Sequence, residues 1–423
     1  MSRMAFVLAL LLAPLCGRAW AEPASMDAVA IQGLLALARL DGWLLYDYRG
    51  QNPVARDLAQ PKGDAMHRWF YLIPSRGEPV ALLHRADAPR LAVLPGRRMV
   101  YEGYRELEAS LRELLKGRKR VAMEYSPSAA LPDLSRVDAG TVEQVRGLGV
   151  EVVPSADLMQ AMRARWSKEA RASHYVAAHH LVQVKDDALA FLAQEIRAGR
   201  TVTERDVAQR VLTQYAMRDL ETEAPPVIAS GPSTGTPHHV PAQATSRVIQ
   251  EGDLVLVSLA AKQAGSPGAV HASLTWMAFV GNAVPARLSK LFALVAKARD
   301  ETVAFVNERI RSRRPVRGWE ADKIARDIIA RGGHERDFRV GTGHSLGTRL
   351  VGDGAHLDGF ETRDERVLLQ GMGFTVSPAI FLEGELGLRT EVNCYVSPTG
   401  IETTIPAQRA IVPLLAPAPS ELE

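Results

Sequence analysis

The chain has 423 residues, a hydrophobic share of 47% and a formal net charge of +3 at pH 7. This composition is typical of a globular protein, and basic residues alternate with acidic ones along the chain. We therefore expect no nucleic-acid partner. We also expect no stable membrane insertion, because no apolar stretch is long enough to cross a bilayer.

The first residues have the pattern of an export signal. Arg3 supplies a positive start, residues 4–15 are apolar, and Ala19-Trp20-Ala21 is a small-x-small cleavage site. We predict a signal peptide over residues 1–21, cleavage after Ala21, and a periplasmic or secreted protein; an uncleaved amphiphilic N-terminus is the alternative. Cleavage would leave Cys394 as the one cysteine, which excludes an intramolecular disulfide.

The rest of the chain is too long for one ordinary core, so we predict two domains, 22–157 and 158–418. The first has a mixed α/β pattern. Short apolar and aromatic runs bounded by turn residues predict strands, and a helical pattern lies between them. These strands are expected at 42–46, 69–73 and 121–125, and the helix at 107–115.

Helices dominate the start of the second domain. Ser167 is a plausible cap for a helix through Ile196, Gly199 ends that helix, and Thr203 begins the next. Two apolar runs with a Gly-Ser-Pro-Gly turn between them then predict a hairpin. The hairpin strands are expected at 254–259 and 273–280, and two later helices at 286–311 and 319–332.

Five ordered segments in this half carry a specific pattern. They are GDLVLVSL at 252–259, ASLTW at 272–276, GTGHSLG at 341–347, GMGFTVSP at 371–378 and GLRTEV at 387–392. In order and spacing they resemble the creatinase and Xaa-Pro aminopeptidase superfamily, which includes prolidase and methionine aminopeptidase. The resemblance covers about 157–414 and, more weakly, the N-terminal part. It implies an α/β (α+β) pita-bread domain after a smaller creatinase-type domain, and a homodimer.

Metal-dependent members of that superfamily hold two divalent ions with two aspartates, one histidine and two glutamates. The matching positions here are Ser258, Ser273, His344, Ser377 and Glu391. Two such ions need carboxylates to balance their charge and fix their separation, and a neutral hydroxyl is a poor substitute. The resemblance therefore predicts a degenerate metal site and no metal cofactor.

Two further losses accompany the missing carboxylates. Active peptidases of this type carry histidines four residues before and seven residues after the metal-binding one, where this chain has Val340 and Val351. Asp253 lies near Ser258 and could compete with it as the first ligand position. We interpret Asp253 instead as an exposed residue of the turn that opens the strand.

The remaining candidate residues could support chemistry without a metal. His238, in Thr-Pro-His-His at 236–239, matches the position at which creatinase uses a histidine as acid and base. A metal-free hydrolase needs such a base and a group that polarises the substrate, for which Arg389 or His344 would serve. The structural alternatives are a loop histidine at 238, a hydrogen-bonded core histidine at 344, and a buried ion pair between Arg389 and Glu391.

Three functional hypotheses follow from these residues. The leading one is a degenerate hydrolase that binds a small molecule or peptide in the old cleft. The second is a metal-free hydrolase or lyase that acts on a small amide or amidine through His238. The third is an Xaa-Pro peptidase with one rebuilt zinc site from His271, His344 and Glu391. A serine nucleophile is not favoured, because the chain lacks a Gly-x-Ser-x-Gly elbow.

Overall fold

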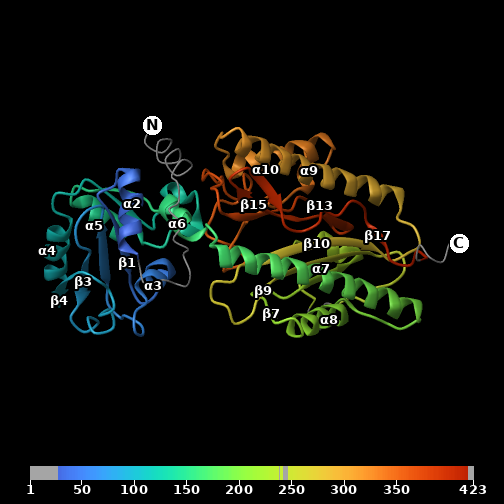
Figure 1. Cartoon of the computed structure of the whole chain (residues 1–423), viewed down its shortest axis with the longest axis horizontal. Helices are drawn as coiled ribbons and strands as arrows, with labels where there is room; N and C mark the ends of the chain where they lie inside the picture. Colours follow the sequence, from blue (N-terminus) through green and yellow to red (C-terminus); the bar gives the residue numbers. More distant parts are fainter. Residues whose placement is uncertain (1–26, 238, 242–245, 418–423) are drawn as a thin grey trace. The chain divides into compact units, whose positions relative to one another are not determined.

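The computed structural model describes residues 27–237, 239–241 and 246–417. The predicted signal peptide and His238 lie outside these residues. The chain divides into two compact units, and the second unit begins at Arg163. The fold is mixed α/β, as predicted (Figure 1).

The first unit is built on a six-stranded sheet with the order β4-β3-β2-β1-β5-β6. β1 runs antiparallel to β2 and parallel to β5. Every residue of β1 and β2 is buried, so both faces of these central strands are covered. The strands are β1 (Gly42–Asp47), β2 (Trp69–Pro74), β3 (Val80–His84), β4 (Arg97–Tyr101), β5 (Arg120–Met123) and β6 (Glu151–Pro154). The helices are α2 (Ala28–Ala38), α3 (Pro53–Ala59), α4 (Tyr104–Leu115), α5 (Ala139–Gly147) and α6 (Ala156–Arg163).

The first two helices of the second unit begin where their caps predict. The Ser167 hydroxyl accepts from the backbone of Ala170, and Thr203 forms a reciprocal capping box with Asp206. These local signals fixed the helix starts from sequence alone. The helices are α7 (Lys168–Arg197), α8 (Glu204–Ala216), α9 (Ala286–Arg311) and α10 (Gly318–Arg331).

The strands of the second unit form three groups. The first is the sheet β17-β10-β9-β7, in which β8 also pairs with β9; the second is the sheet β11-β12-β15-β16; and the third is the hairpin β13-β14. The first group comprises β7 (Leu220–Glu221), β8 (Val227–Ser230), β9 (Leu254–Gln263), β10 (Ala272–Phe279) and β17 (Val412–Pro413). The others are β11 (Ser345–Leu346), β12 (Gly373–Val376), β13 (Ala379–Leu382), β14 (Leu386–Arg389), β15 (Val392–Ser397) and β16 (Gly400–Thr403).

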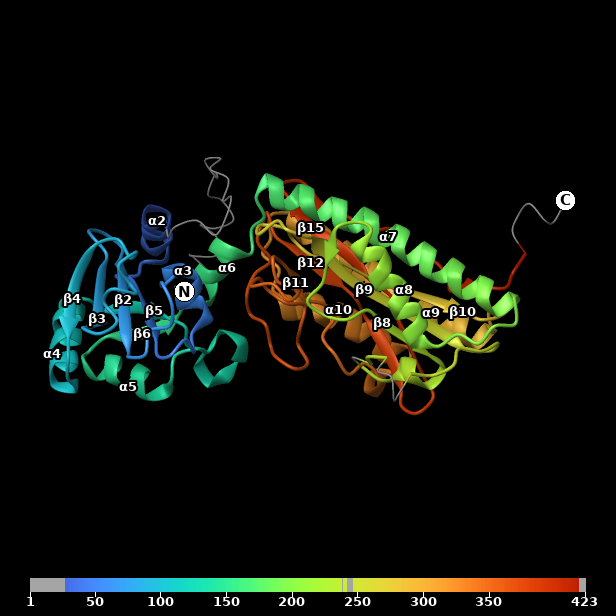
Figure 2. The same ribbon diagram turned by 90° about the horizontal axis from the view of Figure 1, so that it is seen from below.

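Two helix pairs enclose these strands (Figures 1 and 2). Side chains alternate along β9, so Val255 and Val257 pack with the core of α7 and α8, whereas Leu254 and Leu256 pack with that of α9 and α10. The predicted hairpin of β9 and β10 is confirmed, and it has helices on both of its faces.

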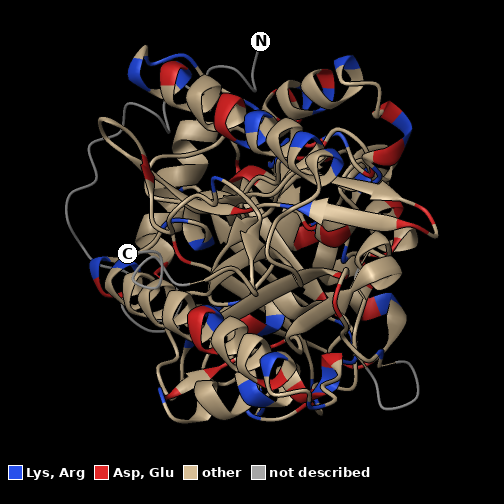
Figure 3. Cartoon of the chain, turned by 90° about the vertical axis from the view of Figure 1, so that its right-hand side faces the viewer, with Lys and Arg blue, Asp and Glu red and all other residues tan. Residues whose placement is uncertain are grey.

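The charges on this unit are mixed. Lysine and arginine lie interspersed with aspartate and glutamate along the outer helices (Figure 3). Within the described part of the chain, no helix combines the length and apolarity that crossing a membrane requires.

Candidate functional site

The β9–β10 hairpin brings two of the substituted serines onto one face. Ser258 lies opposite Thr275, and Ser273 lies opposite Ala260. Since side chains alternate along a strand, Ser258, Ser273 and Thr275 share the face that looks away from α7. This placement follows from the local sequence, because alternate β-branched residues of β9 fill the opposite core.

A chain of hydrogen bonds runs from this face to Glu391. The Thr275 hydroxyl donates to Glu391 Oε2 over 2.6 Å and lies 2.9 Å from the Ser258 hydroxyl. Because a carboxylate only accepts hydrogen bonds, the Thr275 hydroxyl donates its hydrogen to Glu391 and accepts one from Ser258. Glu391 is 1% exposed, and its second oxygen, Oε1, is buried without a hydrogen-bond partner. That carboxylate therefore lacks one donor.

Ser377 accepts a hydrogen bond from an arginine side chain. Arg389 Nε donates to the Ser377 hydroxyl over 2.7 Å, and the Ser377 backbone donates to the carbonyl of Thr342. The alternative of an ion pair between Arg389 and Glu391 is wrong: Arg389 bonds to Ser377 and Glu391 bonds to Thr275. A guanidinium thus touches the hydroxyl at the position that the resemblance matches to a metal-binding glutamate.

His344 lies beside these two charged residues. Its Nδ1 is 3.0 Å from the carbonyl of Ser345, and its backbone N–H donates to the hydroxyl of Thr375. Burial lowers the pKa of His344, an effect that Glu391 opposes and Arg389 strengthens. The imidazole is therefore neutral at pH 7.

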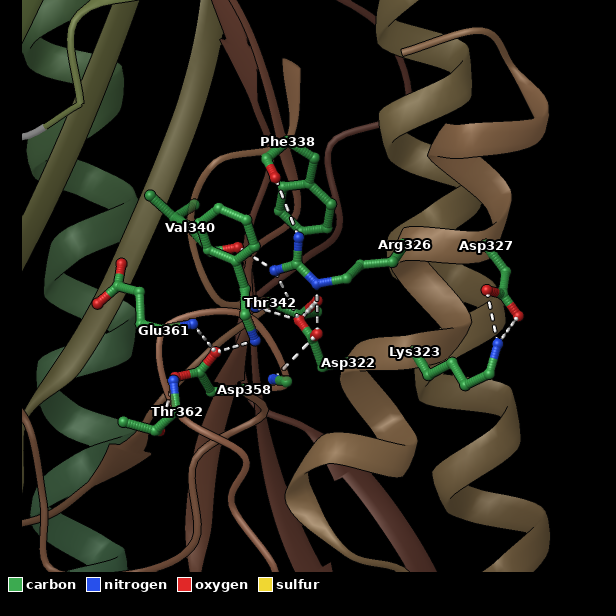
Figure 4. A network of polar contacts seen from close by, with 12 residues as sticks. Asp322, Lys323, Arg326, Asp327, Phe338, Val340, Thr342, Asp358, Glu361 and Thr362 are labelled. Carbon is green, nitrogen blue, oxygen red and sulfur yellow. Dashed lines mark hydrogen bonds and ion pairs between the residues drawn. The ribbon is translucent and has the colours of Figure 1, made fainter. Parts of the chain in front are cut away.

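The loop before His344 is held by an ion pair from α10 (Figure 4). Arg326 bonds to the Asp322 carboxylate and donates to the carbonyls of Phe338 and Val340. Asp322 in turn accepts from the backbone and hydroxyl of Thr342, at 2.9 and 2.6 Å. Val340 contributes its carbonyl to this brace and packs its side chain on the core of α9 and α10.

His356 is a residue of this region that the sequence did not single out. Its Nδ1 accepts from the backbone N–H of Ser345 over 3.0 Å. Burial, together with the charges of Arg366 and His344, lowers the pKa of His356 to about 3. No motif spacing marks this histidine, because a loop of irregular backbone brings it to β11.

His271 lies in a different electrostatic environment. Its Nδ1 is 3.3 Å from the carbonyl of Gly347, and its Nε2 is buried without a partner. Burial lowers its pKa, and the charges that act on it are those of Glu223, Lys262 and Glu221. The structure thus does not join His271 to Glu391.

His239 occupies the position next to the undescribed His238. Its Nε2 lies 3.0 Å from Glu204 Oε2 in the first turn of α8, and Glu204 is fully buried. Glu204 also accepts from the backbone and hydroxyl of Ser230. His239 therefore has a structural partner, and the catalytic role of His238 stays a prediction.

The prediction that Asp253 is an exposed turn residue is wrong. Asp253 is 8% exposed, and its carboxylate accepts from the backbone of Gln250 over 3.0 Å. The turn that precedes β9 folds its carboxylate inward to satisfy this backbone N–H. The Asp253 carboxylate therefore bonds within the turn and does not take the metal-ligand position of Ser258.

The residues present do not fit a pair of divalent ions. Over the described ranges, no group of three or more histidine, cysteine, aspartate or glutamate side chains could hold a metal ion. His344 and Glu391 supply two of the five positions, and Ser377 is bonded to Arg389. A fixed guanidinium at this place repels a cation and attracts an anion.

Comparison with known proteins identifies related chains. The profile of metallopeptidase family M24 matches residues 177–398. An Xaa-Pro dipeptidase of Pyrococcus horikoshii is 28% identical over 233 residues, which cover 54% of this chain and 60% of that protein. The uncharacterized peptidase YqhT of Bacillus subtilis is 26% identical over 265 residues, which cover 62% of this chain and 68% of that protein.

Solved structures show the same fold. A prolidase from Thermococcus sibiricus matches with a TM-score of 0.62 and 21% identity, over 92% of this chain and 100% of the prolidase. The dipeptidase PepE from Mycobacterium ulcerans matches with a TM-score of 0.67 and 21% identity, over 92% of this chain and 96% of that one. The predicted pita-bread architecture is confirmed.

Proposed function

The chain belongs to metallopeptidase family M24, and on that basis we propose that it is an exported protein that binds a small molecule or peptide without the metal pair. The binding residues lie in what we call the central site, formed by Ser258, Ser273, His344, Ser377, Arg389 and Glu391. One observation carries the proposal: Arg389 donates to Ser377, so a guanidinium borders the place at which related enzymes hold metal.

The unpaired hydrogen-bond donors and acceptors of the central site indicate the ligand. Only Nε of Arg389 is engaged, and its two terminal nitrogens have no partner among the described residues. A free guanidinium fork binds a carboxylate with two parallel hydrogen bonds. Glu391 Oε1, buried and without a donor, can accept from an ammonium or amide N–H. A zwitterion such as an amino acid or short peptide supplies both groups.

Metal content and ligand binding test this proposal together. The full chain is purified and equilibrated with manganese, cobalt or zinc, and bound metal is measured after desalting. The same samples are assayed for cleavage of alanyl-proline, and binding of amino acids and dipeptides is measured by calorimetry. We expect far less than two equivalents of metal, no metal-dependent cleavage, and binding of at least one zwitterion. Two retained equivalents with cleavage of alanyl-proline would refute the proposal.

Two arginine variants locate the binding site. Arg389→Met removes the proposed carboxylate anchor and keeps much of the side-chain volume, so binding is expected to weaken about tenfold to a hundredfold. Arg287→Met is the matched control, because Arg287 is an exposed arginine that pairs with Glu385 elsewhere in the unit. Equal affinity of the two variants would place the ligand outside the central site.

Export and self-association are the remaining parts of the proposal. Mass spectrometry of the protein from the cell envelope or medium should find a chain that begins at Glu22. Sedimentation should find a homodimer, as the resemblance implies. An uncleaved chain in the cytosolic fraction would contradict export without affecting the binding proposal.

A further inference from the structure

Ser345 holds two histidines through its own backbone. Its carbonyl lies 3.0 Å from His344 Nδ1, and its N–H donates to His356 Nδ1 over 3.0 Å. A carbonyl only accepts, so His344 Nδ1 must carry the hydrogen. An amide N–H only donates, so His356 Nδ1 must be bare. A neutral imidazole has one N–H, which leaves a lone pair on Nε2 of His344 and a hydrogen on Nε2 of His356.

The two rings lie at the same edge of β11. Thr375 donates its N–H to the carbonyl of His344 on the β12 side, so the N–H and carbonyl of Ser345 face the opposite edge. Gly352 also donates to that Ser345 carbonyl, and Gly354 donates to the Ser345 hydroxyl. The loop that ends at His356 therefore wraps around Ser345 and brings the second ring beside the first.

Both outer nitrogens are available to a ligand. Neither Nε2 has a hydrogen-bond partner among the described residues, and both histidines are partly exposed. The backbone of Ser377, which holds Arg389, donates to the carbonyl of Thr342, two residues before His344, so His344 lies at the central site. The charges of Arg389 and Glu391 act on its ring. The charge of His344 acts on His356 in turn. The proton acceptor His344 thus lies near the Arg389 guanidinium, and the N–H donor His356 lies next to His344.

We propose that His344 and His356 make the central site a metal-free hydrolase for an ester or amide that carries a carboxylate. This rests on the proposed metal-free binding site and adds a reaction to it. His344 would be the general base and His356 a neutral electrophile, which donates a hydrogen bond without giving up its proton. Arg389 would hold the carboxylate of the substrate.

The proton and bond changes balance with water as the one co-reactant. His344 Nε2 takes a proton from water while the water oxygen bonds to the carbonyl carbon. The His356 N–H donates to the oxygen that becomes negative. The imidazolium of His344 then returns the proton to the departing nitrogen or oxygen as its bond to the carbonyl carbon breaks. One water is consumed, and both histidines regain their starting tautomers.

Asparagine variants separate this role from a structural one. In His344→Asn the side-chain amide can still donate to the Ser345 carbonyl, and in His356→Asn the side-chain oxygen can still accept from the Ser345 N–H. Each variant keeps the inner hydrogen bond and removes the outer nitrogen. His334→Asn is the control, because His334 lies outside the site and bonds to Asp337.

The test uses a probe that matches the proposed anchor. Hydrolysis of the 4-nitrophenyl monoester of adipic acid is compared with that of its methyl-capped, uncharged counterpart. We expect the wild type to prefer the anionic ester, each asparagine variant to lose at least about a hundredfold in kcat, and His334→Asn to match the wild type. Absence of hydrolysis above the buffer rate, or an asparagine variant as active as the wild type, would overturn the proposal.

The tautomers give a readout that does not depend on activity. Long-range nitrogen–proton NMR of the chain labelled at histidine distinguishes Nδ1–H from Nε2–H, and the signals missing from each asparagine variant assign the two residues. We expect Nδ1–H in His344 and Nε2–H in His356, and the opposite tautomer in either residue overturns the proposal. A metal-free protein that binds a zwitterion but hydrolyses nothing refutes this inference and leaves the proposed function standing.

Discussion

The brace between α10 and the His344 loop gives a sharp prediction about stability. Arg326 is 21% exposed and Asp322 is 1% exposed, and the Arg326 guanidinium lies 4.4 and 4.6 Å from the ring centroids of Phe338 and Phe360. Arg326→Met keeps the apolar stem between the rings and removes the charge. Asp322 then remains buried without its cation, and we expect the free energy of unfolding to fall by about 3 kcal/mol.

A double-mutant cycle assigns this loss to the ion pair. Asn at position 322 can still accept from Thr342 but carries no charge, so Asp322→Asn combined with Arg326→Met should cost about 1 to 2 kcal/mol less than Arg326→Met alone. Arg363→Met is the matched control, because Arg363 also covers a ring, that of Trp319, but pairs with the half-buried carboxylate of Glu365. Its expected cost is under about 1 kcal/mol.

Unfolding in urea, followed by tryptophan fluorescence and circular dichroism, measures these differences. Burial raises the pKa of Asp322 and Arg326 opposes this rise, so removal of Arg326 raises the pKa further. When folding raises the pKa of a carboxyl group, the free energy of unfolding of the protein falls as pH increases. The cost of Arg326→Met should therefore be larger at pH 8 than at pH 5. A cost below about 1 kcal/mol, or one that is independent of pH, would refute the role given to the pair.

Three further predictions concern buried polar groups. Burial raises the pKa of Glu124 from 4.5 to about 7, although Trp43 and Asn52 donate hydrogen bonds to it. The free energy of unfolding of the wild type should therefore fall by about 3 kcal/mol between pH 4.5 and pH 7. Glu124→Gln should abolish this dependence of the free energy of unfolding on pH, measured by urea unfolding at several pH values. An unchanged pH dependence would contradict the prediction. Thr275→Val leaves both oxygens of buried Glu391 unpaired and should lower the free energy of unfolding in urea by about 1 to 3 kcal/mol, and an unchanged free energy would contradict the role given to this hydrogen bond. Burial raises the pKa of the Cys394 thiol, so the native chain should not react with a thiol reagent that labels it fully once unfolded.

The sequence predicted what local patterns determine. Capping residues predicted the starts of α7 and α8, and two apolar runs with a turn between them predicted the β9–β10 hairpin. Both signals involve neighbours within a few residues, so no knowledge of the distant chain was needed. The resemblance to a known fold supplied the order of the later strands.

The contacts that the sequence did not predict join distant segments. Arg389 could pair with Glu391 or with Ser377, and that choice depends on the relation between the β13–β14 hairpin and β9–β10. His356 reaches Ser345 through a loop that has no periodic pattern. Asp253 turns inward because a backbone N–H of its own turn needs an acceptor. Residue type alone does not decide between such partners.

The charges of the central site connect these substitutions with one another. The resemblance implies that metal-dependent members balance two divalent ions with four carboxylates, a set that is neutral as a whole. It matches three of those positions to serines here, and Glu391 and Arg389 are then the one acidic and the one basic side chain, histidine apart, among the residues of the central site. Loss of the metal alone would leave four buried like charges, and loss of the carboxylates alone would leave the metal unbalanced. We therefore propose that the three serines and the bond from Arg389 to Ser377 form one arrangement, a site that is neutral without a metal and stays neutral when it binds a zwitterion.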